Sequence, residues 1–568
     1  MNGLEKAFWN FSALLVFCFF QQAGVPQATA PAAQPAPAPS ATEFRISGRV
    51  VDAVSGQALS KAQVSIGMAN NPDAARVEVS GEDGGFVFRG VAPGKYTLAA
   101  RRRGYVQQLY QQHERFSTAI VIGPGLEAEN LRFELRPGAS ISGNVTDEAN
   151  DAVRHAQVML FEQSNIAGKR RTAIARRTNA DDEGHYHFGH LTPGTYFVGV
   201  SATPWYAQHG FRQQTPRQER FSRDGVLEEG LQMPSEQNQS LDVAYALTFF
   251  SNANELEGAA AITVHSGDAE IADVTMRPVP ALHVLVKTAV QDPSQGMNVQ
   301  VMRMVGENIS EPVQVTFSQV APGVMEVAGV PPGKVSLGVN TAQKNNAWTR
   351  RTQSVQVSGD MTVDETEGPR GVVVSGVLKV DDGTPVPQPA RVRLRNTVSG
   401  ESSDTEVSAS GEFSFQEDPV ETGSYELIII QGQGLLIRKL TSPSVKTSGR
   451  SFQIATAQDV SVNIVAGRSN GQVTGYALKD EKAVAGVMVV LVPEDLHANP
   501  ALFRRDQSDS DGSFTLAGVI SGKYSVVAIE NGWELEWSDP DVMRKFVAGG
   551  EAVELRPGGK ADVKVKVQ

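Results

Sequence analysis

A short pattern of alternating apolar and polar positions returns five times along the chain. In the first copy, DGGFVFRGVAPGKYTL at 83–98, Phe86 and Phe88 alternate with polar residues, and Tyr96 resumes the alternation after a Pro-Gly pair at 93–94. Period-two alternation predicts two strands that each bury one face. The Pro-Gly pair predicts a type II turn between them. The stretch is therefore expected to form a β-hairpin.

The other copies keep this hairpin to different degrees. The copies at 182–198 and 511–527 are close to the first, and the fourth copy has a longer turn. The third copy keeps the Pro-Gly pair but has Val335 where the others have Tyr. Successive turn glycines are 90 to 139 residues apart, and they are Gly94, Gly194, Gly333, Gly423 and Gly522.

Two further strand patterns accompany most of the hairpins. The first pattern opens the unit and reads ISGRVVD, ISGNVTD, VSGVLKV or VTGYALK. The second pattern begins 10 to 14 residues after the glycine of the first and reads AQVSI, AQVML, ARVRL or AGVMVVLV. A repeat of 20 to 50 residues would indicate stacked units with a shared core. A period near 100 residues with several strands predicts independent β-sandwiches, each long enough to bury its own core.

These patterns predict an all-β protein, a tandem array of about five Greek-key, Ig-like or prealbumin-like β-sandwich domains after a signal peptide and a Pro/Ala-rich linker. The second sandwich carries an insertion at about 203–262. The expected parts are a signal peptide at 1–30, a linker at 31–42, and sandwiches at 43–136, 137–279, 280–369, 370–469 and 470–568.

The N-terminus indicates export. An apolar run from Ala7 to Phe20 follows Lys6, and it is short for a membrane span. We expect a cleaved signal, with a retained N-terminal anchor as the alternative, and no membrane span in the mature chain. Cys18, the only cysteine, lies inside this segment, so the mature chain has no disulfide. This favours a bacterial envelope protein, in the periplasm, at the outer membrane or outside the cell.

The hairpins and opening strands resemble the carboxypeptidase regulatory-like domain, a transthyretin-like (prealbumin-like) β-sandwich. The shared pattern is SGxV, then A.V, then DxxGxFxFxxVxPGxYxL, and it covers the first, second and fifth units best. CnaB-type surface domains are similar too. The resemblance implies a seven-stranded Greek-key sandwich per unit. It implies no peptidase activity, because this domain is the non-catalytic companion in carboxypeptidases.

The sequence offers no recognisable catalytic site. None of the nine histidines lies in an HxxE or HExxH pattern, and no nucleophile elbow, P-loop or dinucleotide-binding loop is present. His185 and His187 share a strand face with a spacing that suits zinc or copper, and His190 follows. The alternation instead turns Tyr186 inward and leaves the histidines to solvent. We therefore predict no catalytic residue, no metal and no cofactor.

Aromatic residues outside the hairpins are the candidates for ligand binding. Trp205 and Tyr206 lie in the insertion of the second unit, and Trp533 and Trp537 follow the last hairpin in a loop-like stretch. Aromatic side chains on loops are often binding residues. The alternative for the insertion is that its aromatic residues cover the core of the sandwich, and these residues are Trp205, Tyr206, Phe211, Tyr245, Phe249 and Phe250.

These features favour a non-catalytic exported scaffold that binds an envelope protein or a surface polymer through a row of sandwiches. A carbohydrate-binding array is the main alternative, and a hydrolase with an unrecognised site is the other. The net charge of −12 argues against a nucleic-acid partner. We expect no transporter barrel in this chain, because its last residues form one ordinary alternating strand, ADVKVKVQ.

Overall fold

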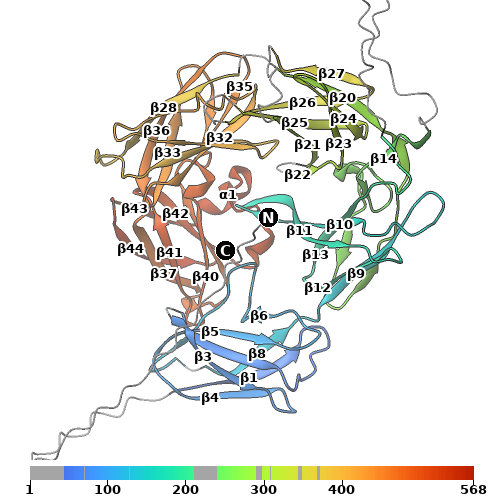
Figure 1. Ribbon diagram of the computed structural model, residues 1–568. Helices are drawn as coiled ribbons and strands as arrows, with labels where there is room; N and C mark the ends of the chain where they lie inside the picture. The colour runs from blue at the N-terminus through green and yellow to red at the C-terminus, as the bar shows by residue number, and fades with distance from the viewer. Residues whose placement is uncertain are drawn as a thin grey trace, which may run out of the picture. The chain divides into compact units, whose positions relative to one another are not determined.

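In the computed structural model, the described residues form five β-sandwiches in tandem, running from blue to red in Figure 1. The predicted all-β fold class is therefore confirmed. Glu43–Gln568 forms one compact unit. The signal peptide and the linker lie outside the residues that the structure describes, which are 44–69, 71–126, 128–209, 240–288, 297–306, 309–342, 348–366 and 371–568. Among these, no helix has the length and apolar character to cross a membrane.

Sandwich 1 has two facing sheets with strand orders β4-β1-β8 and β3-β2-β5-β6, and β7 also pairs with β5. The predicted inward positions Phe86 and Phe88 are buried in its core. Its strands are β1 (Phe44–Asp52), β2 (Gln63–Met68), β3 (Asn71–Val79), β4 (Gly85–Val91), β5 (Gly94–Arg101), β6 (Gln108–Leu109), β7 (Ile120–Ile122) and β8 (Ala128–Leu135).

Sandwich 2 repeats this arrangement with sheets β12-β9-β17 and β11-β10-β13-β15. Gly194 of β13 pairs with β16 in the way that Gly94 of β5 pairs with β7, so β15 and β16 belong to the common fold. The extra residues of the predicted insertion therefore precede β15. The strands are β9 (Ala139–Thr146), β10 (Gln157–Ile166), β11 (Lys169–Asn179), β12 (His185–Leu191), β13 (Gly194–Ser201), β14 (Val243–Tyr245), β15 (Thr248–Phe249), β16 (Ile262–Val264), β17 (Ala269–Ile271), β18 (Val274–Thr275) and β19 (Pro278–Pro280), with η2 (Leu256–Gly258).

Sandwich 3 keeps the fold although its hairpin is the poorest copy. Val335 is buried at the position where the other copies have Tyr. Its sheets are β23-β24-β20-β27 and β22-β21-β25-β26. The strands are β20 (Leu282–Lys287), β21 (Met297–Gly306), β22 (Ile309–Pro312), β23 (Thr316–Ala321), β24 (Val324–Val330), β25 (Gly333–Ala342), β26 (Trp348–Val357) and β27 (Met361–Asp364).

Sandwich 4 has sheets β31-β28-β36-β33 and β30-β29-β32-β35-β34 around its own apolar cluster. Its strands are β28 (Val374–Val380), β29 (Arg391–Asn396), β30 (Ser402–Glu406), β31 (Glu412–Ser414), β32 (Gly423–Gln431), β33 (Leu435–Thr441), β34 (Thr447–Ser448), β35 (Ser451–Ile454) and β36 (Val460–Arg468).

Sandwich 5 adds short helical elements to the same two-sheet plan, with sheets β38-β37-β41 and β40-β39-β42-β43 and with β44 beside β37. Its elements are β37 (Gly471–Lys479), β38 (Lys482–Ala483), β39 (Met488–Pro493), η3 (Pro500–Leu502), β40 (Arg504–Gln507), β41 (Ser513–Val519), β42 (Gly522–Ile529), η4 (Gly532–Glu534), α1 (Pro540–Val547), β43 (Glu551–Leu555) and β44 (Lys560–Lys566).

The first strand of each sandwich pairs in parallel with a strand near its end, which explains the glycine of the opening pattern. A Cβ at that glycine would lie under 3.0 Å from a carbonyl oxygen of the parallel neighbour, so only Gly permits the approach. Sandwich 3 has no such glycine. The four residues are Gly48, Gly143, Gly376 and Gly475.

The hairpin corner is closed by its tyrosine and not by a type II turn. The Tyr96 hydroxyl donates to the Ala92 carbonyl oxygen at 3.0 Å, and Tyr196, Tyr425 and Tyr524 bond the carbonyl four residues earlier in the same way. Gly94 has φ of 156°, far from the value near 80° that a type II turn needs. The expected turn type is wrong because the returning strand already begins at the glycine.

Sandwiches 1 and 5 are in contact although about 390 residues separate them in sequence. The amide of Ser510 donates to the Ala119 carbonyl oxygen, and the Gln507 Nε2 donates to the Thr118 hydroxyl at 2.8 Å. Lys95 forms an ion pair with Asp509. The sandwiches are therefore not an open row, which is how the sequence alone suggested they would lie.

Candidate functional site

The loop after β13 presents the two aromatic residues that the sequence singled out. Trp205 is 86% exposed, the highest fraction among the exposed large apolar side chains of the described residues. Its ring meets the ring of Tyr206 edge-on, with centroids 5.7 Å apart. A turn in which Ala207 N donates to the Pro204 carbonyl oxygen holds the loop. The structure thus brings Trp205 and Tyr206 together at the surface.

Tyr206 is anchored by a carboxylate at the start of the β9–β10 connection. Its hydroxyl donates to Glu148 Oε1 at 2.6 Å, and the hydroxyl of buried Tyr245 donates to Glu148 Oε2 at 3.4 Å. Burial and the hydrogen bond to Glu148 raise the pKa of Tyr206 to about 12. Burial, together with the charge of Glu148, also raises the pKa of Tyr245. Both phenols are therefore donors at neutral pH, and Trp205 rests on a fixed partner.

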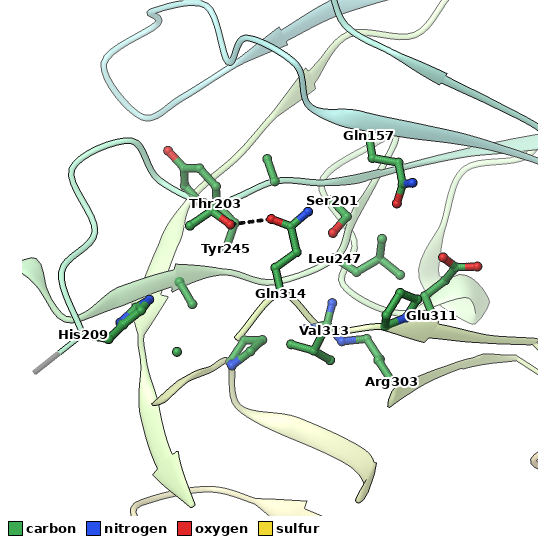
Figure 2. Close-up of a pocket in the computed structure, with 15 residues that line it drawn as sticks. Gln157, Ser201, Thr203, His209, Tyr245, Leu247, Arg303, Glu311, Val313 and Gln314 are labelled. Carbon is green, nitrogen blue, oxygen red and sulfur yellow. Dashed lines mark hydrogen bonds between the residues drawn. The ribbon is translucent and has the colours of Figure 1, made fainter. Parts of the chain in front are cut away.

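A small cavity lies beside this loop, between sandwiches 2 and 3 (Figure 2). Its volume of about 20 Å³ accommodates a single water molecule. The Thr203 hydroxyl of sandwich 2 donates a hydrogen bond of 2.7 Å to Gln314 Oε1 of sandwich 3. Arg303 and Glu311 of sandwich 3 also line it. The cavity is thus a gap in the interface between two sandwiches, and it is too small for an organic ligand.

A chain of alternating carboxylates and imidazoles crosses the same junction. His283 Nδ1 lies 2.7 Å from Glu326 Oε1, and His283 Nε2 lies 2.7 Å from Asp242 Oδ2. The other oxygen of Asp242 lies 2.8 Å from His209 Nδ1. Burial lowers the pKa of His283, but the bonds to Asp242 and Glu326 outweigh it, and the pKa is raised. Both ring nitrogens of His283 face carboxylate oxygens, so this position favours the imidazolium, which can donate from both.

Trp533 and Trp537 do not form an exposed pair. Each is 8% exposed, and both pack in an apolar cluster with Met488 and Ile529. Trp533 lies in η4, and Trp537 lies between η4 and α1. Trp533 Nε1 donates to the Gly486 carbonyl oxygen at 3.3 Å. The loop-like interpretation of this stretch missed the short helical elements that turn the rings inward. Trp533 still lines a polar cleft where sandwiches 1, 2 and 5 meet, whereas Trp537 does not line it.

The other aromatic residues of the insertion mostly pack inward. Tyr245 and Phe249 are buried, and Phe250 is partly buried against the core, as the alternative interpretation held. Phe211 lies outside the described residues.

The three histidines of β12 lie on its outward face. His185, His187 and His190 are exposed, while Tyr186 and Phe188 are buried, as the alternation predicted. His185 Nδ1 is 3.6 Å from Glu183 and 3.8 Å from Asp181. In the described ranges no group of three or more His, Cys, Asp or Glu side chains is arranged to hold a metal ion.

Sequence reasoning missed the anchor Glu148 and the polar chain at the junction. Nothing in the sequence around Glu148 distinguishes it from other loop carboxylates. His283 did carry a signal, because it is a lone titratable residue between Leu282 and Val284 at the start of an apolar strand. A buried His in such a position needs a partner.

Comparisons with known proteins agree with the β-sandwich architecture. The family model of the carboxypeptidase regulatory-like domain matches residues 45–135 and 140–228, which are most of sandwich 1 and the first part of sandwich 2. No curated protein matches the sequence.

Several solved structures of bacterial surface proteins are similar over long stretches. The Bacillus anthracis TIE protein is 13% identical, with 75% of each chain covered and a TM-score of 0.16. The Streptococcal ancillary pilin is 12% identical, covering 50% of this chain and 98% of its own, with a TM-score of 0.18. The minor pilin GBS52 of Streptococcus agalactiae is 12% identical, covering 34% and 94%, with a TM-score of 0.18. At such scores these likenesses carry no argument about function. The family-model match, by contrast, identifies the first two sandwiches of this chain as similar to the carboxypeptidase regulatory-like domain.

Proposed function

We propose that this chain is a non-catalytic, exported scaffold of a bacterial cell envelope, which binds an envelope protein or a surface polymer through the Trp205 loop. The observation that carries the proposal is the exposed indole of Trp205, held against Tyr206. Trp and Tyr are enriched among the residues that contribute most to binding at protein interfaces. The match to a regulatory-like domain and the serial sandwiches also support a binding role.

A carbohydrate-binding role is the second candidate, and the same ring favours it. An exposed indole with an adjacent phenol offers a flat apolar surface for the C–H face of a sugar ring. The polar rim, with Glu148 and the Tyr206 hydroxyl, would bind the hydroxyl groups. The two candidates differ in whether the partner is a protein or a polysaccharide.

The test is capture from an envelope fraction by the purified protein, with and without Trp205→Ala. We expect a bound protein or polysaccharide with the wild type and a loss of about tenfold or more with the variant. Phe317→Ala is the matched control, because Phe317 is also an exposed aromatic residue but lies on β23 of sandwich 3. Equal capture by the wild type and Trp205→Ala would refute the proposed role of this loop. Digestion of the captured material with a protease or a glycosidase tells the two candidates apart.

A further inference from the structure

Where sandwiches 1, 2 and 5 meet, residues from all three line a polar cleft with two adjoining lobes. Each lobe measures about 430 Å³, and Gln108, Gln112, His113 and Arg136 line both. Pockets for organic ligands commonly measure 300 to about 1,000 Å³. The cleft is therefore large enough for a ligand of several sugar units, unlike the cavity beside Trp205.

Its walls carry hydrogen-bonding side chains that are not used elsewhere. Gln107 and Arg136 come from sandwich 1, and Gln163 and Arg170 come from sandwich 2. In the part of the chain that the structure describes, no hydrogen bond or ion pair engages these four side chains, although the main-chain amides of Arg136 and Arg170 are bonded. A carboxamide offers a donor beside an acceptor, and a guanidinium offers several donors. This set suits neighbouring hydroxyl groups, each of which also donates and accepts.

The cleft also contains a rigid flat surface. The ring of His113 stacks on the ring of Trp533 with centroids 4.7 Å apart and planes 4° apart. His113 Nδ1 lies 3.2 Å from Gln507 Oε1, which fixes the ring in its plane. Burial lowers the pKa of His113, so the ring is neutral at pH 7. A neutral ring of this kind can pack against the C–H face of a sugar.

The charges around the cleft favour an uncharged ligand. Arg136 and Arg170 are opposed by Glu162 and Glu534, which line the same lobe. Burial raises the pKa of Glu162, so its charge is held at a cost. The whole chain has a net charge of −12, which repels polyanions. We propose that this cleft binds a segment of a neutral polysaccharide, with its hydroxyl groups on the uncommitted amides and guanidinia.

This inference specifies the surface-polymer partner of the proposed function, but it concerns a different site. It rests on the proposed function only in that an exported protein meets such polymers. Binding in the cleft is expected to survive Trp205→Ala, so failure of the Trp205 loop and failure of the cleft are distinguishable.

The test is calorimetric titration of the purified protein with neutral hexasaccharides of glucose, xylose, mannose and N-acetylglucosamine, with oligogalacturonate as the anionic comparison and an extended polar peptide as the protein-like one. We expect at least one neutral hexasaccharide to bind. The double variant Gln163→Ala/Arg170→Ala should raise its Kd by about tenfold or more. The matched control is Gln300→Ala/Arg89→Ala, which changes two exposed residues of the same types outside the cleft.

Three results would overturn the inference. In the first, no neutral hexasaccharide binds at millimolar concentration. In the second, only the oligogalacturonate or the peptide binds. In the third, a neutral hexasaccharide binds but the cleft variant and the control variant retain the same affinity. Because all four changes are at partly or fully exposed side chains, circular dichroism of the variants should match the wild type and exclude unfolding as the cause.

Discussion

The buried imidazolium at the junction of sandwiches 2 and 3 allows a quantitative prediction. His283→Ala removes the group that bonds both Glu326, which is 0% exposed, and Asp242. Removing one member of a buried ion pair typically costs about 3–5 kcal/mol. We therefore expect sandwich 3 to lose about 3–5 kcal/mol of stability.

The loss has a defined pH dependence. The pKa of His283 is raised above its ordinary value of 6.5. A raised pKa means that the native state binds the proton more tightly than the unfolded state. Its contribution is therefore complete below pH 6.5 and is lost as the pH rises through the raised pKa. The difference between the wild type and His283→Ala should be larger at pH 6 than at pH 9.

The assay is native-state hydrogen exchange of the amides of β20 and β24, because global unfolding of a chain with five sandwiches is not a single two-state step. His265→Ala is the matched control. His265 also bonds an aspartate, Asp268, at 3.0 Å, but its side chain is 79% exposed, and we expect no measurable change. If both variants exchanged alike, or if the His283 effect did not shrink at high pH, the buried-imidazolium argument would be refuted.

Three further predictions address the hairpin, the opening strand and the contact between sandwiches 1 and 5. Tyr524→Phe leaves the Ile520 carbonyl oxygen without the tyrosine hydroxyl that donates to it. It should lower the stability of sandwich 5 by about 1–2 kcal/mol, measured by hydrogen exchange, whereas Tyr476→Phe at an exposed site should cause no measurable loss. Gly475→Ala places a Cβ against the Val563 carbonyl oxygen and should lower the stability of sandwich 5 by at least about 3 kcal/mol. A Cβ at Gly359 meets no atom within 4 Å, so Gly359→Ala should cause no measurable loss in the same assay. Arg505→Ala should separate sandwich 1 from sandwich 5 and raise the radius of gyration in solution scattering. An unchanged radius would show that Arg505 does not hold this contact.

The sequence predicted features that depend on neighbours close in the chain. The alternation at Phe86 and Phe88 fixed the buried face, because successive side chains of a strand point to opposite sides. The hairpin tyrosine was recognised as part of the pattern, but its bond to the carbonyl four residues earlier was not. Val335 replaces it in sandwich 3 without loss of the fold, since an apolar side chain fills the same core position.

One missed element had a readable local signal. α1 begins with Asp539 as N-cap, whose side chain accepts from the amides of Asp541 and Val542, and Pro540 occupies the first helical position. Asp-Pro before a run with basic residues at its end is a helix signature. Recognising it would have shown that Trp537 precedes a helix and does not lie in an open loop.

The contact between sandwiches 1 and 5 could not be predicted in this way, because its parts are far apart in the sequence. The side chain of Arg505 is 3% exposed, and its guanidinium carbon lies 4.8 to 5.5 Å from the ring centroids of Phe116, Trp533 and Trp537. Its charge is neutralised by Glu114 of sandwich 1. Burying an arginine is favourable only when such partners are in place. Since Phe116 and Glu114 come from sandwich 1 and Arg505 comes from sandwich 5, an open row of sandwiches would leave this cation without its carboxylate and without one of its three rings. The same docking brings His113 onto Trp533 and so builds the floor of the polar cleft. The docking of sandwich 1 on sandwich 5 is therefore also what forms the cleft of the proposed polysaccharide site.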